Sequence, residues 1–179
     1  MSDQDSAQVV RWLCHDMATP ISTLLTASEL LSDPADPEIN QLITAAIRKL
    51  SARLRLVRMA MGSTSSMGLP ALEKLLAEAL PDTPVRLVLS EAGGVPASLV
   101  AGAALILSDI AGATPLLIDD KGAYWQPEMA LPDHAADALA GRVITDARSA
   151  MIALVGLQGR AGGWALEARS SGLGFKPLG

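Results

Sequence analysis

Two long apolar stripes of helical spacing, separated by a proline-rich break, constrain this chain more than any other feature. The break is Asp33-Pro34-Ala35-Asp36-Pro37, whose prolines and aspartates favour a turn. On each side of it, apolar residues recur mostly every three, four or seven positions, which predicts one helix before and one after. The stripes comprise Val10, Leu13, Met17, Leu24 and Leu31, then Ile39, Ile43, Ala46, Leu50, Leu54, Val57 and Met61. Pro20 lies inside the first stripe and predicts a local bend, because proline removes a helix hydrogen bond.

These two helices cannot bury both stripes by themselves. A helical hairpin that dimerises into a four-helix bundle would bury them, and the near-heptad spacing of the second stripe favours such packing. Gly62 and the serine-rich run at 63–66 are expected to end the second helix. We therefore expect a dimerisation hairpin over residues 1–64.

From residue 67 onward the pattern changes to short alternating elements. Apolar spacing predicts helices near residues 72–80, 100–110, 135–140 and 147–157. Strands are expected near residues 85–89, 116–118, 123–126, 164–169 and 174–176. The chain is therefore predicted to be of the α+β class, with a small α/β layer of helices on a mixed sheet over residues 67–179.

Composition excludes several classes of function. The formal net charge of −5 argues against a general nucleic-acid-binding protein. A single cysteine excludes an internal disulfide and fits a reducing compartment. We find no secretory signal pattern and no uncharged apolar run of about 18 residues, so we expect a cytoplasmic protein without a membrane span.

The segment His15-Asp16-Met17-Ala18-Thr19-Pro20 carries the clearest chemical signal. Neutral imidazole has a free nitrogen lone pair near neutral pH, which makes histidine a good nucleophile. At about 100° per residue, His15 points away from Leu13 and Met17 and should be accessible. The following acid, Asp16, is placed to hydrogen-bond the other ring nitrogen and stabilise positive charge on the ring. Thr19 lies one turn further on the same face.

This segment resembles the phospho-accepting box of two-component histidine kinases. With the hairpin and the α/β region that follow, the whole chain resembles bacterial histidine phosphotransferases of the ChpT-like family, whose second domain looks like a degenerate kinase ATP-binding domain. The resemblance implies phosphoryl transfer between receiver-domain aspartates through His15 as phospho-acceptor, with Asp16 as its partner and Thr19 near the site. It also implies a homodimer whose partners are response-regulator receiver domains, including that of a hybrid kinase.

The residues expected of an ATP-binding kinase domain are missing. The helix that should carry paired asparagines reads Leu105-Ile106-Leu107-Ser108-Asp109-Ile110-Ala111-Gly112, and Asn40 is the only asparagine in the chain. The Asp-x-Gly-x-Gly adenine loop is also absent from the sequence. We therefore expect a phosphotransfer protein that binds no cofactor and is not an ATP-dependent kinase; the receiver would supply Mg²⁺.

Basic residues offer a docking surface, to which we assign Arg11, Met17, Arg48 and Arg55. Arg48 and Arg55 are seven residues apart and share one helix face, which suits them to steer an acidic receiver. An ordinary solvated face with weak salt bridges is the alternative. For the whole protein, the alternative function is a non-catalytic adaptor or inhibitor that binds kinases or receiver domains.

Overall fold

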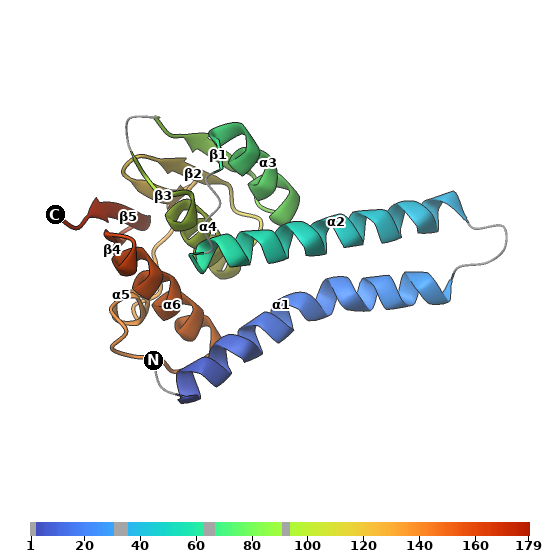
Figure 1. Ribbon diagram of the computed structural model, residues 1–179, viewed down its shortest axis with the longest axis horizontal. Helices are drawn as coiled ribbons and strands as arrows, with labels where there is room; N and C mark the ends of the chain where they lie inside the picture. Colours follow the sequence, from blue (N-terminus) through green and yellow to red (C-terminus); the bar gives the residue numbers. More distant parts are fainter. Residues whose placement is uncertain (1–2, 31–35, 63–66, 91–93) are drawn as a thin grey trace.

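The N-terminal part of the protein is a long antiparallel helical hairpin. The computed structural model describes residues 3–30, 36–62, 67–90 and 94–179. Helices α1 (Asp3–Glu29) and α2 (Pro37–Ala60) run side by side, and their connected ends project away from the rest of the molecule (Figure 1). The predicted hairpin is confirmed, although Leu31, most of the proline-rich break and residues 63–66 lie outside the described part of the chain.

Local sequence explains how each hairpin helix begins or bends. Asp36 caps α2: its carboxylate accepts a hydrogen bond of 2.8 Å from the backbone N–H of Glu38, and Pro37 follows as the first helical residue. Pro20 lies within α1 and has no N–H to donate to the carbonyl of Asp16, four residues earlier. Helix α1 changes direction near its middle (Figure 1), as the proline predicts.

The second part is an α/β layer built on a five-stranded mixed sheet. Its elements are α3 (Leu69–Ala79), β1 (Val85–Val88), α4 (Ala97–Ala111), β2 (Leu116–Asp119), β3 (Gly122–Trp125), α5 (Ala135–Leu139), α6 (Ala147–Ala161), β4 (Trp164–Arg169) and β5 (Gly172–Pro177). The strand order is β1-β2-β3-β5-β4; β1 and β2 are parallel, and the other neighbours are antiparallel. The predicted α+β class is confirmed.

Helix α4 is the centre of this layer. It is apolar on all sides, and every residue from Leu99 to Leu107 is buried. Trp125 of β3 donates its indole N–H to the carbonyl of Leu107 at 3.2 Å, which fixes the helix against the sheet. On its other side, Gly102 lets Val155 of α6 approach so closely that a Cβ at residue 102 would overlap the valine methyl group.

One hydrophobic core joins the hairpin to the α/β layer. Helix α1 contacts α6, while α2 contacts both α3 and α4. Trp12 of α1 and Leu56 of α2 therefore belong to the same buried cluster as Leu76 and Leu105. The two predicted parts, residues 1–64 and 67–179, therefore share one hydrophobic core.

In the N-terminal part of α1, the face that is buried differs from the face that the sequence predicts. Val10 is 57% exposed, whereas Val9 and Trp12 are 8% and 5% exposed. Leu13, Met17 and the other described members of the first stripe are only half-buried. Helix α1 packs against both α2 and α6, and the face that carries Trp12 is the buried one, so much of the predicted stripe is left at the surface.

Candidate functional site

A pocket of about 320 Å³ lies where the hairpin meets the α/β layer. The lining residues come from four places: His15, Asp16, Thr19 and Pro20 of α1; Lys49 and Arg53 of α2; Ala79, Leu80, Pro81, Asp82 and Thr83 at the end of α3; and Ser108, Asp109 and Gly112 at the end of α4. The joint between the two parts thus brings the histidine segment together with residues far away in the sequence.

The imidazole of His15 lines this pocket. It is exposed, on the part of α1 that follows the buried Trp12, and Thr19 lies one turn further along the pocket wall. Pro20, five residues after His15, leaves the helix locally without one backbone hydrogen bond. The imidazole thus lines the pocket and is accessible from solvent.

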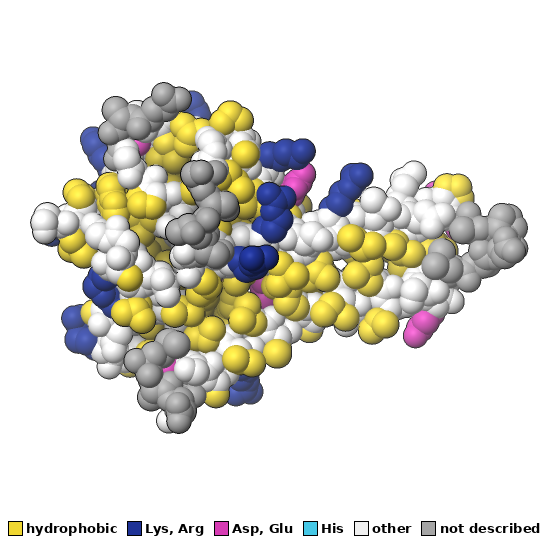
Figure 2. All heavy atoms as spheres, in the orientation of Figure 1, with side chains coloured by type: hydrophobic (Ala, Val, Ile, Leu, Met, Phe, Trp, Pro, Cys, Tyr) yellow, Lys and Arg dark blue, Asp and Glu magenta, His cyan; other side chains and the backbone are white. Residues whose placement is uncertain are grey.

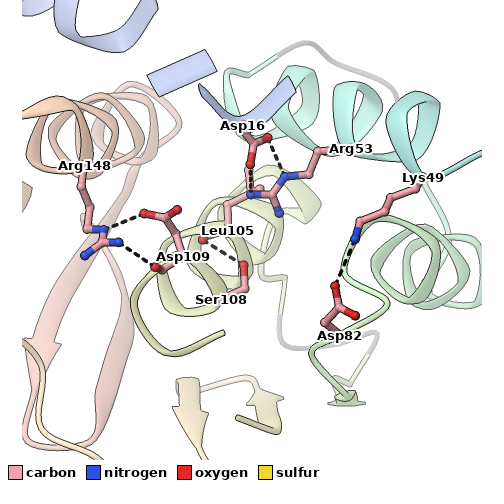
Figure 3. A network of polar contacts seen from close by, with 8 residues as sticks. All are labelled: Asp16, Lys49, Arg53, Asp82, Leu105, Ser108, Asp109 and Arg148. Carbon is pink, nitrogen blue, oxygen red and sulfur yellow. Dashed lines mark hydrogen bonds and ion pairs between the residues drawn. The ribbon is translucent and has the colours of Figure 1, made fainter. Parts of the chain in front are cut away.

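Asp16 forms a two-pronged ion pair with Arg53 of the neighbouring helix (Figure 3). The guanidinium Nε and Nη2 donate hydrogen bonds of 2.8 and 2.7 Å to the two carboxylate oxygens. The side chains of Arg53 and Asp16 are only 12% and 16% exposed, and the guanidinium lies 5.9 Å from the ring centroid of Trp12. In this structure, then, Asp16 holds Arg53 rather than the imidazole expected from the sequence.

Lys49 forms a looser ion pair across the mouth of the pocket. It lies one turn before Arg53 on α2 and donates a hydrogen bond of 3.0 Å to Asp82, in the turn after α3 (Figure 3). Lys49 is 44% exposed and Asp82 is 79% exposed. The two cations of the pocket are therefore held differently, since one is enclosed and the other faces water.

The opposite wall is formed by the C-terminal ends of α3 and α4. Helix C-terminal ends carry partial negative charge, so this wall favours cations rather than phosphate groups. Asp109, at the position of the missing asparagine box, is paired at 2.7 Å with Arg148 of α6, and the Ser108 hydroxyl donates to the carbonyl of Leu105 (Figure 3). The polar side chains of Asp109 and Ser108 are thus already bound to other groups of the protein.

The residues assigned to docking lie outside the pocket lining. Arg11, Arg48 and Arg55 are exposed, and Met17 is half-buried. Arg48 borders a shallow groove on α2 together with Asn40, Gln41, Thr44 and Ala45. The structure thus leaves the three arginines accessible on the hairpin surface.

Sequence reasoning missed Arg53 and Lys49 as members of the site. A signal for Arg53 was present, because Asp16 lies 18 residues before Pro34 and Arg53 lies 19 residues after it. In a hairpin that turns near Pro34, these two positions must lie opposite each other. Lys49 could not be found in the same way, since its partner comes from outside the hairpin.

Within the described residues, no cluster of histidine, cysteine, aspartate or glutamate side chains could hold a metal ion. Among the helices of those same residues, none combines the length and apolar character needed to cross a membrane.

Comparison with known proteins supports the fold. No protein-family model matches the sequence, and no curated protein matches it. A solved 1.7 Å structure of a bacterial phosphotransferase is similar, with a TM-score of 0.66 at 18% sequence identity. The similarity covers 98% of this chain and 96% of that chain, so it includes both the hairpin and the α/β layer.

Proposed function

We propose that this protein is a phosphorelay histidine phosphotransferase, in which His15 carries a phosphoryl group between receiver-domain aspartates. The observation that carries the proposal is an exposed imidazole in a pocket with two cations from the neighbouring helix. The likeness of the whole fold to a bacterial phosphotransferase supports it. Phosphoryl transfer depends mainly on positioning and charge neutralisation, which such a pocket supplies.

The transfer step is a simple exchange of bonds. An imidazole nitrogen of neutral His15 attacks phosphorus, the P–O bond to the receiver aspartate breaks, and the carboxylate leaves with the electron pair. The ring then loses its extra positive charge when the other nitrogen releases its proton to water. Passing the group to a second receiver reverses these steps. Thr19 lies beside the imidazole and would contact the incoming receiver loop.

Asp16 has a positioning role in this proposal. Since both of its carboxylate oxygens bind Arg53, it holds α1 and α2 in register beside His15. Its effect on His15 is through this placement, because its charge is already paired with the guanidinium.

We propose that the functional unit is a homodimer formed through the hairpin. Hydrophobic side chains gather along the outer surface of α1 and α2 (Figure 2). The exposed ones include Ile21, Leu25, Leu30, Leu42, Ile47 and Leu54. A second copy of the hairpin would cover them in a four-helix bundle, as such stripes require.

Receiver domains are the proposed partners, in the cytoplasm. Arg11, Arg48 and Arg55 would steer an acidic receiver towards the hairpin, and Met17 would supply apolar contact. The receiver would bring its own Mg²⁺, so this chain needs no metal or ATP of its own.

The experiment is phosphoryl transfer from a panel of labelled receiver domains, with Mg²⁺, to the wild type and to His15→Ala. His134→Ala is the matched control, because His134 is the only other histidine and starts α5 away from the pocket. We expect label on the wild type and on His134→Ala, none on His15→Ala, and none from ATP alone. Receiver binding without label on any variant would favour the adaptor function instead. Label from ATP alone would contradict the proposal.

A further inference from the structure

The two cations of the pocket differ in how firmly they are held. Arg53 is enclosed, with two donors on Asp16 and its guanidinium over Trp12. Moving it would leave a largely desolvated carboxylate without a partner, which is costly. Arg53 is therefore a structural cation, because it is already paired with Asp16 before any partner binds.

Lys49 is free to change partner. Within the part of the chain that the structure describes, its ammonium group donates one hydrogen bond, to Asp82, and both side chains are well exposed to water. Ion pairs this exposed contribute little to stability, so the contact opens at small cost. Lysine also has a flexible stem and three donors, which lets the ammonium group follow a mobile anion.

A phosphoryl group on His15 would compete well for this ammonium group. Lys49 and His15 line the same pocket from neighbouring helices. A phosphoryl group carries more negative charge than the carboxylate of Asp82 and offers three acceptor oxygens. Among the described residues that line the wall at the ends of α3 and α4, none is a lysine or arginine, and helix C-terminal ends are partly negative.

We infer that Lys49 neutralises the phosphoryl group on His15, and that Asp82 holds the ammonium group until that group arrives. This inference rests on the proposed function of His15. Lys49 moves no proton in this step: its ammonium group exchanges a carboxylate for the phosphoryl oxygens. Asp82 then competes with the phosphoryl group, so removing its charge makes Lys49 more available.

The test uses phosphoramidate, a small phosphodonor, so that labelling of His15 needs no receiver. The rate of phosphohistidine formation is followed by ³¹P NMR for the wild type, Lys49→Ala, Lys49→Arg and Asp82→Asn. Lys176→Ala is the matched control, because Lys176 forms a similar exposed pair with Glu167, at 2.9 Å, outside the pocket. His15→Ala gives the background.

We expect Lys49→Ala to slow labelling about tenfold, less than the loss of a fully enclosed donor would cause. Lys49→Arg should keep most of the wild-type rate. Asp82→Asn should raise the rate about twofold above the wild type, because the competing carboxylate is removed. Lys176→Ala should match the wild type. A purely structural role would lower the rate in Asp82→Asn as well, since that variant breaks the same ion pair. Unchanged labelling in Lys49→Ala, or slower labelling in Asp82→Asn, would overturn the inference. Failure of the wild type to accept label from either phosphoramidate or receivers would instead overturn the function of His15.

Discussion

Arg53 binds both carboxylate oxygens of Asp16, the residue next to His15, and thereby ties the two helices of the hairpin together at the pocket. The pair is 37 residues apart in sequence and mostly enclosed. Because the carboxylate would be left desolvated without its partner, the pair couples local stability to the position of the histidine.

The first prediction concerns this ion pair. Arg53→Ala should lower the free energy of unfolding by about 2 kcal/mol, between the values typical of exposed and fully buried pairs. Urea denaturation followed by circular dichroism measures it. In a double-mutant cycle with Asp16→Asn we expect a coupling energy of about 1–2 kcal/mol.

Arg142→Ala is the matched control for that experiment. Arg142 also binds an aspartate, Asp137, at 2.7 Å, but the two side chains are 65% and 46% exposed. Its removal should cost less than about 0.5 kcal/mol. Equal effects of the two substitutions would mean that the Asp16 pair is an ordinary surface contact.

The second prediction concerns the exposed apolar side of the hairpin. Leu25 is 60% exposed in the single chain, so Leu25→Asp should leave its fold intact. If a second copy covers this face, each leucine contributes roughly 1.5–3 kcal/mol to association, and a buried aspartate would convert the dimer to a monomer. Sedimentation equilibrium measures the change. Leu178→Asp, near the C-terminus and 46% exposed, should leave the association state as it is; a wild type that is already monomeric would refute the bundle.

The third prediction concerns the contact between α4 and α6. In a free helix, Gly→Ala is favourable by about 1 kcal/mol. At Gly102 the added methyl group meets Val155, so Gly102→Ala should instead destabilise the protein by about 1–3 kcal/mol. Adding Val155→Ala should be less damaging in this variant than in the wild type, because it makes room for the methyl group. Strictly additive effects in thermal unfolding would show that the helices do not meet there.

The fourth prediction concerns pH and the start of α6. The backbone N–H of Ser149 donates to Asp146 at 2.7 Å and holds the pKa of that carboxyl below its ordinary value of 3.8. Since the folded pKa is the lower one, this stabilisation is complete above pH 3.8 and is lost as pH falls through the folded pKa. Asp146→Ala should cost about 1 kcal/mol at pH 7.

Comparison of that variant with Asp146→Asn isolates the charge. Asparagine can still cap the helix but does not titrate. The difference in free energy of unfolding between Asp146→Asn and Asp146→Ala should therefore be the same at pH 7 and pH 3. The difference between the wild type and Asp146→Ala should be smaller at pH 3. Chemical denaturation at both pH values measures the difference. A constant advantage of aspartate would show that the cap does not depend on ionisation.

The periodicity of the sequence was sufficient to predict the helices and strands, but not which of them pack against one another. The break before α2 and the alternation in β1 are local signals, so the hairpin and this strand could be predicted. Which face of α1 is buried is not determined locally: Val10 and Trp12 are both apolar, and Trp12 is buried only because α1 packs against α2 and α6 in the folded chain. The site shows the same limit. His15 was proposed from its own segment, whereas Lys49 is placed by its contact with Asp82, in a turn that only the folded chain brings near.

The core shared by Trp12, Leu56, Leu76 and Leu105 has a consequence for how the chain unfolds. Elements that bury one another's apolar surface unfold together, so the hairpin and the α/β layer should unfold as one cooperative unit. A chain cut after residue 64 would lose the surface that covers Trp12 and Leu56. The α/β layer lacks the adenine loop, yet it remains indispensable as the other half of the hairpin's own core.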